Sequence, residues 1–96
     1  MKKAILTDRI QSSPEFTFKN ECHICAVGTG TFTIERDVGM GFYPLTTEDG
    51  VQMSFTPDED GLMFNSVIKY AGASPKYRVT AVTTGEVEYV IDGGKV

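Results

Sequence analysis

The sequence predicts an all-β fold, a single antiparallel β-sandwich of about seven to eight strands, on the strength of three observations. Polar and apolar residues alternate with a period of two along much of the chain, which is the pattern of half-buried strands. No stretch shows convincing helical periodicity. Turn-forming residues recur roughly every eight to twelve residues, which is the rhythm of a sandwich or small barrel of immunoglobulin-like size.

The alternation places the individual strands. The clearest candidates are residues 31–35, 51–55, 77–81 and 86–91, and two weaker ones are residues 41–45 and 63–70. Turn-forming residues separate them at positions 28–30, 48–50, 57–61, 72–75 and 84–85. We interpret the turns at 28–30 and 57–61 as hairpin turns between neighbouring strands.

Residues 1–14 do not fit this rhythm. Ile5, Leu6 and Ile10 are apolar, but Asp8-Arg9 interrupts the pattern and Pro14 ends it. One interpretation is a short edge strand with a linker, and the other is an arm that reaches onto a neighbouring subunit. In the arm interpretation, Ile5, Leu6 and Ile10 are the partner-binding residues. The predicted organisation is therefore an N-terminal arm or edge strand, residues 1–14, and a β-sandwich domain, residues 15–96.

Composition limits the class of protein. A chain of 96 residues holds one hydrophobic core, and 41% hydrophobic residues are enough to form it. The net charge is −4 and no basic run exceeds Lys2-Lys3, so we expect no binding to nucleic acid. No apolar stretch approaches the roughly 20 residues that span a bilayer, and the N-terminus lacks the apolar core of a signal peptide. We expect a protein made in the cytoplasm, with no membrane partner.

The stretch "ECHIC", residues 21–25, has the two-residue cysteine gap of a zinc knuckle or a redox pair. In a strand, Cys22 would share one face with Ile24, while His23 and Cys25 would share the other. The thiols would then point apart, which suits neither a disulfide nor a chelate. A zinc site also needs four ligands, or three and a water, while the chain has no third cysteine and its one histidine lies between the pair. We interpret the segment as a strand with free thiols, and predict no metal and no cofactor.

Two groups of carboxylates were considered as sites. The acidic turn at residues 58–60 suggests a calcium site, but its acids are consecutive instead of alternating as in an EF-hand loop. Glu86 and Glu88 lie about 7 Å apart along one strand face, a spacing compatible with glycoside chemistry. A solvated turn and a charged outer strand face are the simpler interpretations. We predict no catalytic residues and no enzymatic activity.

Two further patterns have structural interpretations as well. Residues 28–30, Gly-Thr-Gly, are too few for a phosphate-binding loop, which also needs a helix behind it. Phe42, Tyr43 and Tyr70 would form a stacking platform for sugars if they were exposed together. Packing in the core and at its rim is the alternative that we favour for these aromatic residues.

The order of four motifs, "GTGTFTIERD", "GFYPLT", "EDG…SFTPDEDG" and "YRVTAVTTGEVEYVI", resembles small virion proteins of tailed bacteriophages. The resemblance covers about residues 28–92 and is closest to capsid decoration or head-accessory proteins. One departure is the absence of a tryptophan in the second motif, where this chain has Phe42-Tyr43. In the family layout, a strand that begins with Tyr77-Arg78 pairs with the final strand across the turn at Thr84-Gly85.

The resemblance implies a non-enzymatic structural protein that docks in many copies on the capsid lattice. Its partners would be the major capsid protein or other virion proteins, and it would form homo-oligomers, with a trimer as one option. It would be located in the virion after synthesis in the host cytoplasm. The alternatives are a head–tail or tail accessory component, or an immunoglobulin-like module that binds carbohydrate or a cell surface. A redox or metal-dependent regulator built on Cys22 and Cys25 is a third alternative.

Overall fold

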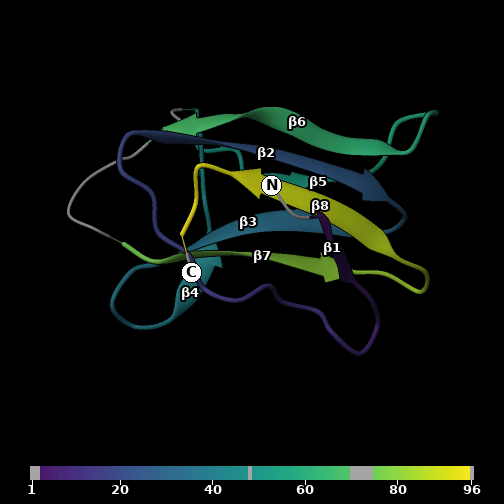
Figure 1. Ribbon diagram of the computed structural model, residues 1–96, viewed down its shortest axis with the longest axis horizontal. Coiled ribbons are helices and arrows are strands. Elements are labelled where there is room, and N and C mark those ends of the chain that lie inside the picture. The colour runs from purple at the N-terminus through teal and green to yellow at the C-terminus, as the bar shows by residue number, and fades with distance from the viewer. Residues whose placement is uncertain (1–2, 48, 70–74, 96) are drawn as a thin grey trace.

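The computed structural model describes residues 3–47, 49–69 and 75–95, which form eight strands in two antiparallel sheets (Figure 1). The first sheet has the order β1 (Lys3–Leu6), β8 (Val87–Asp92), β2 (Glu21–Gly28) and β6 (Leu62–Lys69). The second sheet is built around β3 (Thr31–Asp37), which pairs with β4 (Phe42–Pro44), β5 (Ser54–Phe55) and β7 (Tyr77–Val82). The prediction of a small all-β sandwich is confirmed, and the described residues include no helix able to cross a membrane.

The predicted alternation matches the buried faces of the strands. Apolar residues at every second position face the space between the sheets, where they form one core. Its fully buried side chains are Leu6, Cys22, Ile24, Phe32, Ile34, Tyr77, Val79 and Val87. The strand expected at residues 51–55 is shorter, because Val51 and Met53 hydrogen bond back to Thr47 and Leu45. Only Ser54–Phe55 extends as β5 and pairs with β3.

Three glycine-containing turns connect the two sheets instead of joining paired strands. Residues 28–30 lead from β2 to β3, residues 57–61 from β5 to β6, and residues 83–86 from β7 to β8. The expectation of hairpin turns at 28–30 and 57–61 was therefore wrong. The pairing of the strand at Tyr77 with the final strand was wrong too, because β7 pairs with β3 and β8 pairs with β1 and β2.

Close packing of two of these turns explains their glycines. A Cβ atom at Gly30 would lie 2.1 Å from the carbonyl oxygen of Val82, and its φ of +94° also favours glycine. A Cβ atom at Gly28 would lie 2.3 Å from the carbonyl oxygen of Glu86. Side-chain hydroxyls of Thr29 and Thr83, 3.1 Å apart, add a hydrogen bond between the turns. Gly28 and Gly30 therefore mark positions where the two turns are in close contact.

The N-terminal segment belongs to both sheets. β1 pairs with β8 in the first sheet, from Lys3 opposite Val90 to Leu6 opposite Val87. The chain then crosses to the second sheet, where residues 11–16 hydrogen bond along the outer edge of β7. In Figure 1 this purple segment runs from β1 past β7. Residues 3–6 therefore have the geometry of an edge strand, and residues 11–16 seal the edge of the neighbouring sheet.

Two opposite sides of the sandwich differ as a result. We call the side that residues 3–18 bridge, between β1 and β8 above and β7 below, the closed seam. The opposite side, where β6 of the first sheet lies over β5 of the second, is the open seam; the rings of Phe55 and Phe64 meet there with centroids 4.7 Å apart. Four apolar side chains packed against the core at or near this seam are only half-buried: Leu45, Met53, Phe55 and Phe64.

Candidate functional site

The three residues proposed to contact a partner have different environments. Leu6 is fully buried in the core, at 0% exposure, so it holds β1 to the sandwich and does not present a surface. Ile5 and Ile10 are exposed, at 43% and 60%. A partner-binding role for those two residues stays a prediction. For Leu6, the packing assigns a structural role that the sequence pattern did not distinguish.

The cysteines lie on opposite faces of β2, as the strand interpretation predicts. Cys22 faces the core, and burial raises the pKa of its thiol from 9.0 to about 12, so it remains protonated and weakly nucleophilic at neutral pH. Cys25 is half-buried on the outer face, and both thiols are free. On that outer face Nε2 of His23 lies 2.6 Å from Oδ1 of Asn65, so the imidazole donates a hydrogen bond to the neighbouring strand.

The carboxylates considered as sites have local structural partners. Oδ1 of Asp58 accepts hydrogen bonds from the backbone N–H groups of Asp60 and Leu62, at 2.8 and 3.0 Å, and so shapes its own turn. Glu88 forms an exposed ion pair with Lys3, at 3.4 Å, which links β8 to β1. Within the described parts of the chain, no three histidine, cysteine, aspartate or glutamate residues gather in a group that could hold a metal ion.

The proposed aromatic platform is not assembled by the described residues. Phe42 is half-buried beneath Arg78, whose guanidinium carbon lies 4.4 Å from the ring centroid. The same guanidinium makes an ion pair with Glu35, with Nε and Oε1 2.7 Å apart. Tyr43 is exposed at 52%, and Tyr70 lies outside the described residues. The Phe42 ring thus serves a cation–π and ion-pair cluster on the outer face of the second sheet.

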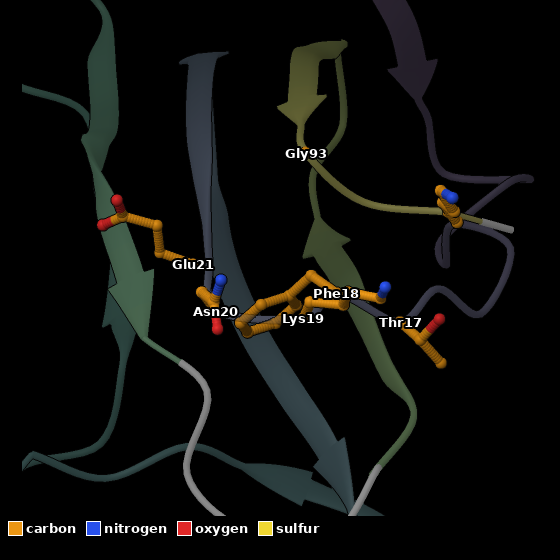
Figure 2. Close-up of a pocket in the computed structure, with 7 residues that line it drawn as sticks. Thr17, Phe18, Lys19, Asn20, Glu21 and Gly93 are labelled. Carbon is orange, nitrogen blue, oxygen red and sulfur yellow. The ribbon is translucent and has the colours of Figure 1, made fainter.

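A pocket of about 670 Å³ lies where residues 17–21 meet Gly93 and Lys95 (Figure 2). Its polar groups include the ammonium groups of Lys19 and Lys95 and the carboxylate of Glu21. Figure 2 shows the carboxylate of Glu21 directed away from Lys19, so these two charges do not converge on one point. The lining residues provide hydrogen-bonding groups, but they do not pair a histidine or cysteine nucleophile with a general base.

The longest unpaired backbone in the described residues is the outer edge of β6. β6 has eight residues and pairs with β2 on one side; on the other side Leu62 bonds to Asp58 of the preceding turn, and no described segment pairs with the rest. By contrast, β1 has four residues, and the outer edge of β7 is covered by residues 11–16. Asn65, Ser66 and Val67 are consecutively exposed in the middle of β6. This edge is the candidate functional site, since exposed edges accept additional strands.

Sequence reasoning missed both this edge and the seal on the other side. The signal for the edge was present, because Asn65-Ser66 places polar residues on both faces of an otherwise apolar strand. The seal depends on pairing between residues 11–16 and β7, far apart in sequence, and alternation along one segment carries no such information.

Comparisons with known proteins do not place the chain in a family. No family model matches the sequence, and no curated protein or solved structure gives a match.

Proposed function

We propose that this chain is a non-enzymatic structural protein of a tailed-bacteriophage virion, which docks in many copies on the capsid as a decoration or head-accessory protein. The proposal begins from the motif order of residues 28–92 and its resemblance to such proteins. The major capsid protein, or another virion protein, would be the partner. The chain would be made in the host cytoplasm and would act in the virion as a homo-oligomer.

The observation that carries this proposal is the asymmetry between the two seams of the sandwich. The closed seam is sealed by the chain's own N-terminal segment, while β6 keeps most of its outer edge unpaired at the open seam, beyond Leu62. A protein used in many identical copies needs a rigid body and a reusable docking element. A sealed sandwich with one long free edge provides both, because an edge strand binds through backbone hydrogen bonds that any extended partner can supply.

Four side chains that could take part in chemistry have structural positions instead, which supports a structural role. The thiol of Cys22 is in the core, Asp58 shapes a turn, Glu35 is held by Arg78, and Glu88 is held by Lys3. These contacts fix strands and turns in place. They are the contacts expected of a protein whose task is to keep its shape on a lattice.

The test is the amount of this chain in purified phage particles. Particles from an infected or induced source culture are banded on a density gradient, and peptides of this chain are quantified against the major coat protein. An abundant cytoplasmic protein of the host, measured in the same bands, controls for contamination. We expect hundreds of copies per particle. A small number per particle would instead assign the chain to a head–tail junction or tail, and its absence would contradict a virion role.

A further inference from the structure

Successive residues of β6 direct their backbone N–H and C=O groups in turn to the partner strand β2 and to the open edge. Two hydrogen bonds at the end of β2 show which residues face which way. Gly28 donates to the carbonyl oxygen of Gly61, at the start of β6, while Thr29 donates toward Glu86, at the start of β8. The register shift next to these bonds inserts its extra residue, Met63, in β6, so the alternation along β2 is unbroken and its even-numbered residues hydrogen bond to β6. Their partners in register are Phe64, Ser66 and Ile68. It follows that Asn65, Val67 and Lys69 direct their N–H and C=O groups to the open edge.

From this geometry we infer that β6 pairs with β6 of a second copy of this chain, antiparallel and about a two-fold axis at Ser66. Pairing about Ser66 sets Asn65 of each copy opposite Val67 of the other, and these are residues whose backbone groups point outward. Each such pair exchanges two hydrogen bonds. The two four-stranded sheets would thereby join into one continuous sheet across the dimer.

Charge complementarity identifies a second copy as the occupant. The acidic turn at residues 58–60 precedes β6, and Lys69 ends it. In an antiparallel pair, Lys69 of each copy lies beside the start of the other copy's β6, within reach of that acidic turn. No ion pair within one copy, among the described residues, engages Lys69 or Asp60. Both ends of the edge therefore carry matching charges that are available to a copy of the same chain.

Burial at the open seam agrees with the pairing. Ser66 lies in register with the fully buried Ile24, so its side chain is directed to the inner face, yet it is exposed. Phe64, two residues away on the same face, is half-buried. A second β6 would place Ser66 against its own copy and Ile68 of the partner against Phe64. The added strand would thus cover the part of the inner face that the monomer leaves open.

The inference concerns the same β6 edge as the proposed function and assigns that edge to the homo-oligomer, but the dimer can form whether or not the chain joins a particle. Its test is sedimentation velocity of the purified full-length chain over a range of concentrations. We expect a reversible monomer–dimer equilibrium. Val67→Pro removes an outward N–H and leaves the bonds to β2 intact, so dimerisation should weaken at least tenfold, about 1.4 kcal/mol. Val67→Thr, which keeps the N–H, is the matched control and should dimerise like the wild type.

A charge exchange tests the same pairing without changing the backbone. Lys69→Glu and Asp60→Lys should each weaken the dimer, whereas the double variant should regain most of the wild-type affinity. This comparison decides the question if Val67→Pro fails to fold. A wild-type chain that stays monomeric up to roughly 1 mM would overturn the inference. So would Val67→Pro dimerising like the wild type, or a double variant no better than the two single variants.

Discussion

The two seams of the sandwich each contain an aromatic pair, and the pairs have the same separation but different surroundings. The ring centroids of Phe18 and Tyr77 at the closed seam are 4.7 Å apart, and so are those of Phe55 and Phe64 at the open seam. The first pair is buried and the second is half-buried. The difference comes from the N-terminal segment, which covers one seam only. A sandwich of this size can therefore be covered on one side by its own chain and stay open on the other.

The largest effect on stability is expected from removing part of the N-terminal segment that covers the closed seam. Deleting residues 3–12 takes Leu6 out of the core, exposes the edge of β8 and removes the bond from Ala81 of β7 to Gln11. Loss of a buried leucine alone costs about 2–5 kcal/mol, which is comparable to the whole stability of a small domain. We expect the deleted chain to lose its cooperative urea transition, followed by circular dichroism.

The control for that deletion is the full-length chain with Ile5→Ser and Ile10→Ser. Both side chains are exposed, so the two substitutions should change the stability little. A deleted chain that unfolds cooperatively at the wild-type urea concentration would show that the segment is a free arm and not a seal.

The aromatic pairs sharpen the comparison at the level of single side chains. Phe18→Ala should destabilise the fold by about 3–5 kcal/mol, because its ring is 6% exposed. Phe64→Ala should cost roughly half as much, because its ring is already partly in water. Both are measured by urea denaturation at a protein concentration low enough to keep the chain monomeric. Equal costs, or a larger cost at Phe64, would mean that the two seams are equally closed.

How far the sequence predicted these features depends on the range of the interaction. Alternation along β3, β7 and β8 predicted the strands and their buried faces, because the two faces of one strand are a local property. It did not predict sheet membership, because glycine-rich turns that join paired strands and turns that cross between sheets contain the same residues.

The candidate site was predictable only in part, for the same reason. The outer-face position of His23 and Cys25 followed from β2 alone. The free edge of β6 did not, because an edge is defined by the strands that fail to pair with it. Pro14 looks like the end of a linker in the sequence, while in the fold the neighbouring Ser13 is part of a ladder with β7.

Removing one of the hydrogen bonds between Ser13 and β7 should have a smaller effect on stability. The N–H of Val79 donates to Oγ of Ser13, at 3.0 Å, and the N–H of Ser13 donates to the carbonyl oxygen of Val79, at 2.8 Å. Ser13→Ala removes the first bond and leaves a buried N–H unpaired, which should cost about 1–3 kcal/mol by urea denaturation. Ser12→Ala, at the exposed neighbour, should change stability by less than about 0.5 kcal/mol. A similar cost for both would contradict the ladder.

The effect that is smallest near neutral pH concerns Cys22, which faces the core that both seams enclose. Burial raises the pKa of its thiol to about 12 in the folded state, from 9.0 when it is free. Between these values the unfolded chain loses this proton while the folded chain keeps it, so stability falls as pH rises from 9 toward 12. Cys22→Ala should show a shallower loss of urea midpoint over this range. Parallel curves for the two proteins would mean that the thiol is accessible to water.

Amide hydrogen exchange, followed by nuclear magnetic resonance at low and high protein concentration, compares the seams most directly. We predict that the amides of Ser13, Phe16 and Tyr77, which donate across the closed seam, are protected at every concentration. The outward amides of Asn65 and Val67 should exchange quickly in dilute protein and slowly in concentrated protein. Rapid exchange at Ser13 and Phe16, or protection at Asn65 and Val67 in dilute protein, would contradict a sandwich sealed on one side and open on the other.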